Sequence, residues 1–98
     1  MPHFFFKLIP PRPTFAMDMT PAEGALMQQH AAYLAEQQPS GKIVLVGPVL
    51  NPRDTFGLAI LEMDSAEQAH AFGENDPSVK AGLNTFEVHP FHLAYLRR

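Results

Sequence analysis

Apolar residues are concentrated in four runs that proline, glycine and helix-capping residues separate. The runs cover residues 4–9, 42–50, 56–63 and 86–96. β-Branched and aromatic side chains are frequent in them, as is typical of β-strands. Pro10 and Pro11 cannot donate hydrogen bonds to a sheet, so the first strand should end before them. Pro90 favours a sheet edge or a bulge for the last strand.

A long amphipathic helix is predicted between the first two strands. Thr20, Pro21 and Glu23 combine an N-cap residue, a proline at the first helical position and a capping box. The helix should end near residues 39–41. Its inward stripe has a spacing of three and four residues and consists of Leu26, Met27, His30, Tyr33, Leu34 and Gln37. His30 therefore lies in the middle of an apolar face.

A second, shorter helix is predicted before the last strand. Residues 64–68 contain overlapping capping boxes at its start, and the helix should break at residues 75–77. Asp76 and Pro77 then have the types expected at the N-cap and first position of a further helical turn, which should end at Gly82. This turn places an acidic side chain directly before the last strand.

The resulting order, β-α-β-β-α-β, predicts an α+β, ferredoxin-like domain over residues 1–98, with the helices on one face of an antiparallel sheet. Residues 43–46 and 58–61 are apolar at every position, which indicates that both faces of the sheet are covered. We therefore expect the second face to pack against the same face of another copy, giving a two-fold homodimer.

Composition narrows the classes of function. The net charge is −3 and the seven Lys and Arg residues are scattered, which argues against a nucleic-acid partner. The chain has no cysteine, so disulfides, thiolate catalysis and Cys-ligated zinc are excluded. Residues 1–7 do not resemble a secretory signal, and no apolar run approaches the length of a membrane span. These features favour a soluble, cytoplasmic protein with no membrane partner.

His30 is the strongest candidate for chemistry, with Asp76 as its expected partner. An imidazole shielded from water transfers protons near neutral pH, and a carboxylate on its other ring nitrogen would fix the tautomer. The alternatives are a structural histidine in the core and an ordinary N-cap aspartate, and one carboxylate should hardly serve both roles fully. His89 and His92 should face opposite sides of a strand, so no metal site is expected.

The connection at residues 10–19 contains apolar residues that are unusual for an exposed loop. They could plug the edge of the core, or form a lid over a pocket, with Phe15 as its wall and Arg12 available to hold an anion. Gly47 and Pro48 predict a bulge or strand exit. They are also candidate substrate-binding residues, although no glycine-rich loop precedes a helix here.

An ordered set of short motifs carries a family resemblance. It comprises His30 in a helix, Gly41-Lys42, Gly47-Pro48, Glu62 before 64–69, Asp76-Pro77-x-Val79-x-Ala81-Gly82 and Val88-x-Pro90-Phe91. Over residues 4–91 the chain resembles the YCII-related (YciI-like) family. The resemblance implies a dimeric, ferredoxin-like α/β barrel with a His/Asp site in each subunit, here His30 and Asp76. It also implies that the histidine is a candidate for phosphorylation. Met27 departs from the family, in which many relatives carry Arg at this position.

These observations lead to three functional hypotheses. The first is a cofactor-independent enzyme of the isomerase or lyase type, in which His30 abstracts a proton from a small cyclic or carbonyl-bearing metabolite and Asp76 orients it. The second is a non-catalytic ligand-binding or sensor domain, in which His30 only binds a small molecule or is phosphorylated. The third is a structural dimer with an inert histidine.

Overall fold

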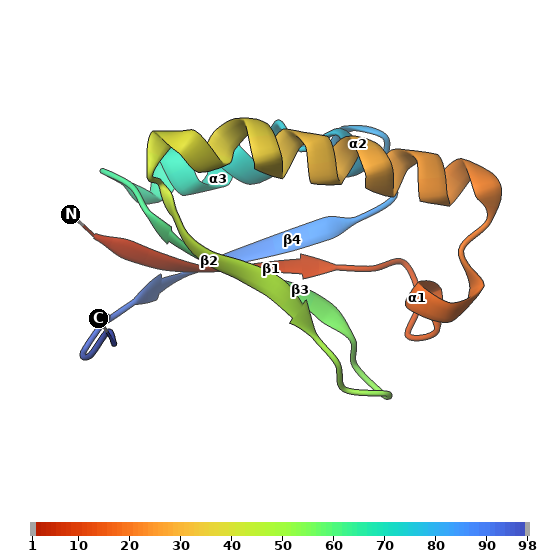
Figure 1. Ribbon diagram of the computed structural model, residues 1–98, viewed down its shortest axis with the longest axis horizontal. Helices are drawn as coiled ribbons and strands as arrows, with labels where there is room; N and C mark the ends of the chain where they lie inside the picture. Colours follow the sequence, from red (N-terminus) through yellow and green to blue (C-terminus); the bar gives the residue numbers. More distant parts are fainter. Residues whose placement is uncertain (1, 98) are drawn as a thin grey trace.

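A computed structural model describes residues 2–97 of the chain. Its four strands form one antiparallel sheet in the order β2-β3-β1-β4. They are β1 (His3–Ile9), β2 (Ile43–Val49), β3 (Phe56–Glu62) and β4 (Thr85–Phe91). The helices are α1 (Phe15–Asp18), α2 (Pro21–Gln37), α3 (Ala66–Glu74) and α4 (Pro77–Lys80), and a 3₁₀ turn, η1 (Gln38–Ser40), follows α2. The predicted α+β, ferredoxin-like architecture is confirmed (Figure 1).

The caps of the two long helices form as the sequence predicted. The Thr20 hydroxyl accepts from the backbone N–H of Glu23, and the Glu23 carboxylate accepts from the backbone N–H of Thr20. At α3, the Ser65 hydroxyl accepts from the backbone N–H of Gln68. These bonds satisfy amide groups that a helix leaves unpaired at its first turn, so the helix starts are fixed locally.

Three details of the prediction were wrong. The connection at residues 10–19 contains the short helix α1 and is not all loop. The last strand stops at Phe91 instead of continuing to residue 96, because its neighbour β1 begins at His3, the residue paired with Phe91. β2 continues through Pro48 without interruption, and its irregularity lies between Ile43 and Leu45. β2 is an edge strand, a position in which a sheet tolerates a proline.

One face of the sheet carries the helices, and β1 shows the alternation clearly. Phe4, Phe6 and Leu8 are buried beneath the helices, whereas the residues between them point to the open face. Phe6 packs edge-on against Phe72 of α3 and stacks with Phe86 of β4, at ring-centre distances of 5.3 and 5.4 Å. The aromatic core therefore lies under α3.

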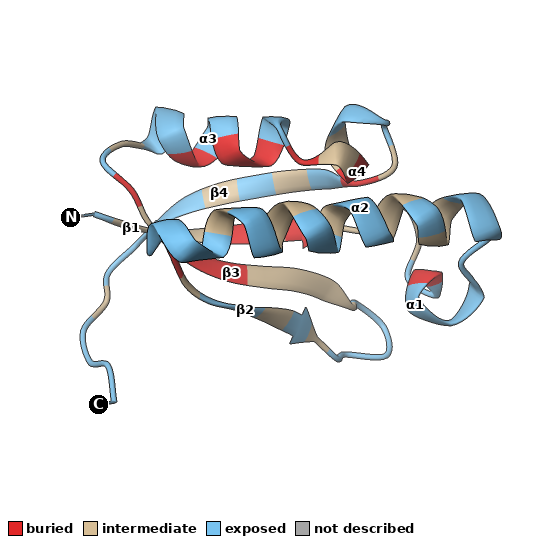
Figure 2. Ribbon diagram, turned by 45° about the horizontal axis from the view of Figure 1, so that its top comes forward, coloured by how far each residue is buried: buried red, intermediate tan, exposed pale blue. Residues whose placement is uncertain are grey.

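The two long helices cover the same face very differently (Figure 2). α3 buries Ala69, Phe72 and Gly73 against the sheet. α2 is the longest helix, at 17 residues, yet none of its residues is fully buried. The space left beneath α2 is where the candidate site lies.

The described helices include none that is long and apolar enough to cross a bilayer.

Candidate active site

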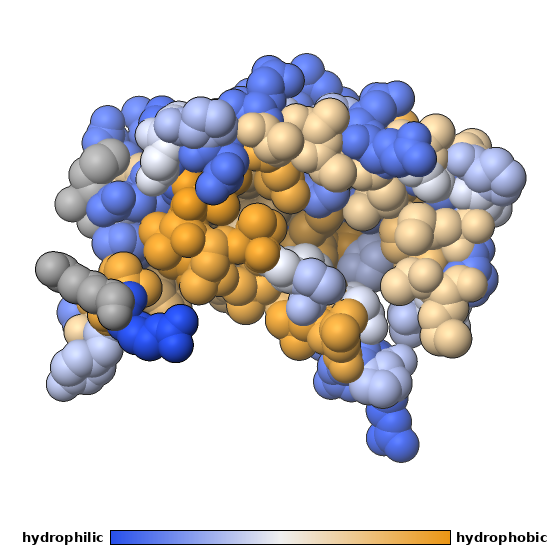
Figure 3. Space-filling view, in the orientation of Figure 1, coloured by the Kyte–Doolittle hydropathy of each residue, from blue (hydrophilic) through white to orange (hydrophobic). Residues whose placement is uncertain are grey.

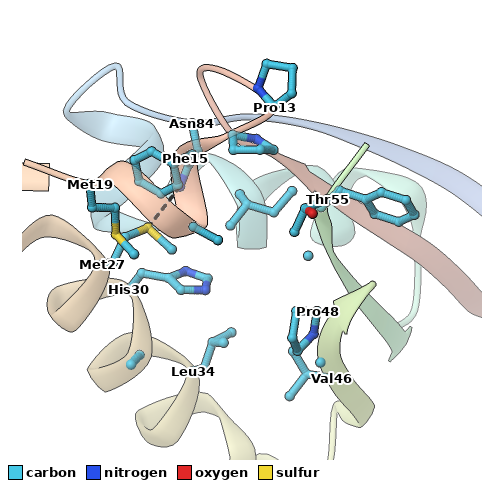
Figure 4. A pocket seen from close by; sticks show the side chains of 17 residues that line it. Pro13, Phe15, Met19, Met27, His30, Leu34, Val46, Pro48, Thr55 and Asn84 are labelled. Atoms are coloured by element: carbon cyan, nitrogen blue, oxygen red, sulfur yellow. Dashed lines mark hydrogen bonds between the residues drawn. The ribbon is translucent and has the colours of Figure 1, made fainter. Parts of the chain in front are cut away.

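A pocket of about 400 Å³ lies between α2 and the strands β2 and β3, with α1 at one end (Figures 3 and 4). Its lining is almost entirely apolar, and the polar side chains in it are those of His30, Thr55 and Asn84. This volume is at the lower end of the range for pockets that enclose small organic ligands. The pocket therefore offers an apolar surface with a few polar groups at defined positions.

The structure brings His30 and Asp76 together across 46 residues of sequence. Nδ1 of His30 lies 2.6 Å from Oδ2 of Asp76. The Asp76 side chain is 1% exposed and that of His30 is 16% exposed. A carboxylate accepts hydrogen bonds, so this contact favours the imidazole tautomer with its proton on Nδ1 and, in the neutral ring, its lone pair on Nε2. The ring projects from α2 into the pocket (Figure 4).

Asp76 also caps α4, and it does so with its other oxygen. Oδ1 accepts from the backbone N–H of Ser78 at 2.9 Å and from its hydroxyl at 2.8 Å. The expectation that capping competes with binding His30 was therefore wrong, because each role uses a different carboxylate oxygen. The cap also fixes the direction of the carboxylate, which stays aligned with the imidazole.

Hydrogen bonds keep Asp76 ionised in spite of its burial. Burial alone would raise the pKa of Asp76, but donation from His30 and from the N–H and O–H groups of Ser78 outweighs this effect and lowers the pKa below its ordinary value. Burial and the charge of Asp76 raise the pKa of Tyr33. The Tyr33 hydroxyl donates to the backbone oxygen of Phe72 at 2.7 Å, so it acts in packing and not in the pocket.

Arg12 lies outside the lining of the pocket and is engaged elsewhere. Its guanidinium donates to Asp18 at 2.8 Å and to both carboxylate oxygens of Glu23 at 2.8 and 2.9 Å. These bonds raise the pKa of Arg12 and lower that of Glu23 to about 2. In place of the anion-binding role expected from the sequence, Arg12 ties α1 to the start of α2.

The other predicted substrate-binding residues all line the pocket. Phe15, from α1, is 5% exposed and forms part of its end wall. Gly47 and Pro48 contribute from β2. Pro48 lies on the side of the pocket opposite His30 (Figure 4). Gly47 has no atom within 4 Å of the position that a Cβ would take, so the backbone there borders open space. Met27 also lines the pocket.

Sequence reasoning missed two buried polar residues behind the histidine. Ser78 is linked to Asp76, and Asn84 is linked in turn to Ser78 at 3.0 Å. No periodicity marked either residue, since both lie in the short segment between α3 and β4. Ser78 could have been found from its position two residues after the predicted cap, where its N–H and its hydroxyl both reach the capping carboxylate.

The remaining histidines lie away from the pocket. His89 of β4 contacts Glu87 at 2.9 Å on the surface, and His3 lies 3.6 Å from Glu62. Within residues 2–97, no three His, Asp or Glu side chains form a group able to hold a metal ion.

Comparisons with known proteins identify relatives of the chain. A family model of the YCII-related domain matches residues 4–92. A similar solved structure is 5-chloro-2-hydroxyhydroquinone dehydrochlorinase (TftG) from Burkholderia phenoliruptrix, in complex with 2,5-dihydroxybenzoquinone. It is 30% identical to this chain, with a TM-score of 0.61, and the match covers 91% of this chain and 93% of that one. No curated protein sequence matches the chain.

Proposed function

Because the chain belongs to the YCII-related domain family, we propose that it is a cofactor-independent enzyme of the lyase or isomerase type that transfers protons on a small ring compound. His30 is the general base and acid, and Asp76 orients it. The observation that carries this proposal is the 2.6 Å contact between Nδ1 of His30 and the buried carboxylate of Asp76. The His30 side chain that makes this contact also lines the apolar pocket.

The geometry suits a base at Nε2. Asp76 holds the imidazole in the tautomer with a proton on Nδ1, which leaves Nε2 unprotonated to accept a proton from a bound molecule. The imidazolium that results is stabilised by the adjacent carboxylate, which stays ionised because its pKa is lowered. The pair can therefore take a proton and return it without any other ionisable group.

The lining indicates the class of substrate. An apolar pocket with a few polar groups favours a flat ring that carries hydroxyl or carbonyl groups. No Lys or Arg side chain is among the described residues that line it, so a strongly anionic substrate would lack a counter-charge. The similar dehydrochlorinase acts on a chlorinated hydroxyhydroquinone, and its complex holds 2,5-dihydroxybenzoquinone. Ring compounds of this kind are the substrates that we propose.

The proposed reaction begins when Nε2 of His30 takes a proton from a ring hydroxyl or an acidic ring carbon. The imidazolium can return this proton to the chlorine-bearing ring carbon, which becomes tetrahedral. A second deprotonation at a ring hydroxyl then supplies the electron pair that expels chloride from that carbon, which completes the elimination of HCl. If no leaving group is present, the ring is protonated at a second carbon by the imidazolium, which completes an isomerisation. In both cases His30 ends in its starting state, after losing its proton to solvent or to the substrate.

The open face of the sheet supports the proposed two-fold dimer. Leu45, Ile60, Phe5 and His89 follow one another across this face in register from β2 to β4. Leu45 is 48% exposed although its neighbours in this row include two further large apolar side chains. Ile60 is already buried, so a second copy that packs sheet to sheet would cover chiefly Leu45 and the half-buried Phe5. Sedimentation equilibrium would show twice the monomer mass, and a stable monomer would contradict the dimer.

The test of the enzyme proposal is turnover of chlorinated hydroquinones, hydroxyquinones and small lactones, followed by absorbance and by chloride release. We expect His30→Ala to lower kcat by at least a hundredfold, and Asp76→Asn to lower it with little change in KM. His92→Ala is the matched control, because His92 is an exposed histidine that does not line the pocket.

Two other results would replace the enzyme proposal. Binding of the same compounds without turnover would show a ligand-binding or sensor domain. Transfer of a phosphoryl group to His30 from a phosphodonor, again without turnover, would favour the phosphohistidine alternative.

A further inference from the structure

The hydrogen bonds behind His30 continue past Asp76 into the interior. Asp76 and Ser78 are 0% exposed and Asn84 is 3% exposed. Asn84 Nδ2 lies 3.0 Å from Ser78 Oγ, which lies 2.8 Å from Asp76 Oδ1. Buried polar side chains cost free energy unless they are paired, so three in contact beside a pocket form a network whose members constrain one another.

We propose that Ser78 and Asn84 are positioning residues that fix the direction of this chain of hydrogen bonds, so that Asp76 keeps one oxygen free for His30. A hydroxyl has a single proton to donate. Because the Asn84 amide donates to Ser78 Oγ, that oxygen acts there as an acceptor, and its own proton is directed to Asp76 Oδ1. Oδ1 is then saturated by Ser78, and Oδ2 remains for Nδ1 of His30.

The turn between α4 and β4 places Asn84 over Ser78. Gly82 has a φ of +79°, a conformation that glycine adopts without strain. After it, the backbone N–H groups of Leu83 and Asn84 both donate to the backbone oxygen of Ser78, at 3.0 and 3.1 Å. Two main-chain bonds therefore support the side-chain bond, and Asn84 holds its position without help from a ligand.

The orientation of the Asn84 amide decides the direction of the chain. In the structure Nδ2 contacts Ser78 Oγ and lies 3.4 Å from the sulfur of Met27, whereas Oδ1 has no partner among the described residues. If the amide were reversed, its carbonyl oxygen would face Ser78 Oγ and accept the hydroxyl proton, which would remove a donor from Asp76. The positioning role therefore predicts that only one of the two amide orientations supports the pair.

The inference concerns the site of the proposed function, but its test reads the side chains directly and does not require turnover. The pH titration of the Asp76 carboxyl carbon and of the His30 ring nitrogens would be followed by NMR in the wild type, Ser78→Ala, Asn84→Ala and the double variant. The titratable groups whose charges interact with Asp76 are His30 and Tyr33, both on α2. Tyr33 stays neutral over the acid range in which Asp76 titrates.

We expect Ser78→Ala to raise the titration midpoint of Asp76, because it removes one donor and keeps the backbone N–H. Asn84→Ala should raise it less, because the hydroxyl remains but is free to rotate. In the Ser78→Ala background, Asn84→Ala should cause no further shift, since Asn84 acts through Ser78. Met27→Leu removes the sulfur contact of the same amide and should leave the midpoint unchanged.

Additive shifts from the two substitutions, or no shift from Ser78→Ala, would overturn the inference. If Asn84→Ala does not fold, the wild type supplies the test. A Ser78 hydroxyl proton shielded from exchange, with a nuclear Overhauser effect to the Asn84 amide, is expected, and a rapidly exchanging hydroxyl would contradict the chain. If the shifts occur but no ring compound is turned over, the positioning role stands and only the proposed function fails.

Discussion

The helices α3 and α2 cover the same face of one sheet, and they differ in how closely they approach it. Under α3, Phe72 packs against Phe6 at a ring-centre distance of 5.3 Å. Under α2, no helical residue is fully buried, and a pocket of about 400 Å³ separates the helix from β2 and β3. We refer to these as the packed half and the hollow half.

The cause lies in the side chains that the two helices direct at the sheet. α3 places a glycine, Gly73, where a Cβ would lie 2.6 Å from the ring of Phe86, so helix and strand are in close contact. At the N-terminal end of α2, Arg12 instead joins Glu23 to Asp18 of α1, and Phe15 of α1 lines the pocket. The difference indicates that the packed half supplies stability and that the hollow half is free to hold a ligand.

The largest effect is expected from truncating one apolar side chain in each half. Phe72→Ala should lower the free energy of unfolding by about 3–5 kcal/mol, because it opens a cavity in a closely packed core. Leu34→Ala, in the wall of the pocket, should cost only about 1–2 kcal/mol, since that side chain already borders empty space. Urea denaturation measures both, and equal losses would contradict the division into two halves.

The buried carboxylate of Asp76, beside the hollow half, should also matter for stability. Asp76→Asn should lower the free energy of unfolding at neutral pH by about 1.5–3 kcal/mol, since it removes hydrogen bonds to a buried charge. The pKa of Asp76 is lowered in the folded state, so its stabilisation is present above about pH 4 and is lost as the pH falls further.

The difference between the wild type and Asp76→Asn should therefore shrink as the pH falls below about 4. Denaturant titrations at a series of pH values would measure it. Asp18→Asn is the control, because Asp18 is an exposed ion-pair partner and its loss should cost much less than that of Asp76. A difference for Asp76→Asn that grows in acid would show that the pKa is shifted in the opposite direction.

A matched pair of glycine substitutions should give effects of opposite sign. Gly24→Ala in α2 has no atom within 4 Å of the new Cβ, so the gain in helix propensity should stabilise the protein by about 0.5–1 kcal/mol. Gly73→Ala in α3 has the same gain, but its Cβ would overlap the ring of Phe86 and should destabilise the protein by about 1–3 kcal/mol. Thermal unfolding would compare them, and two stabilised variants would show that the packed half is less tight than the structure indicates.

Features set by neighbouring residues were predictable from sequence, and features set by distant partners were not. The Thr20–Glu23 cap lies within one turn and fixed the start of α2 correctly. The end of β4 depends on where β1 begins, so the apolar pattern extended the strand too far. α1 was missed because a helix of only four residues leaves little pattern in the sequence. Its position depends on the bond between Arg12 and Glu23, a residue of another element.

The candidate site divides in the same way. The position of His30 on the inward face of α2 followed from spacing, whereas its pairing with Asp76, 46 residues away, came from the family resemblance. Ser78 and Asn84 lie in a segment without periodicity, and only the folded turn brings them behind Asp76. The contact between Asp76 and Ser78 is local to the cap of α4, but the contacts of Asn84 and His30 depend on the folded turn and on α2, which no local pattern predicts.

The smallest effect on stability is expected from filling the hollow half. Ala31→Leu on α2 adds bulk to a side chain that lines the pocket, and leucine forms helices nearly as well as alanine, so the free energy of unfolding should change by less than about 0.5 kcal/mol. The affinity for 2,5-dihydroxybenzoquinone, used as a probe in calorimetry, should nevertheless fall at least about tenfold, because the added atoms occupy ligand space. Ala32→Leu is the matched control, since Ala32 is an exposed neighbour on the same helix that does not line the pocket. Equal affinity in the two variants would place the binding site elsewhere, and a large loss of stability in Ala31→Leu would mean that α2 lies closer to the sheet than the pocket implies.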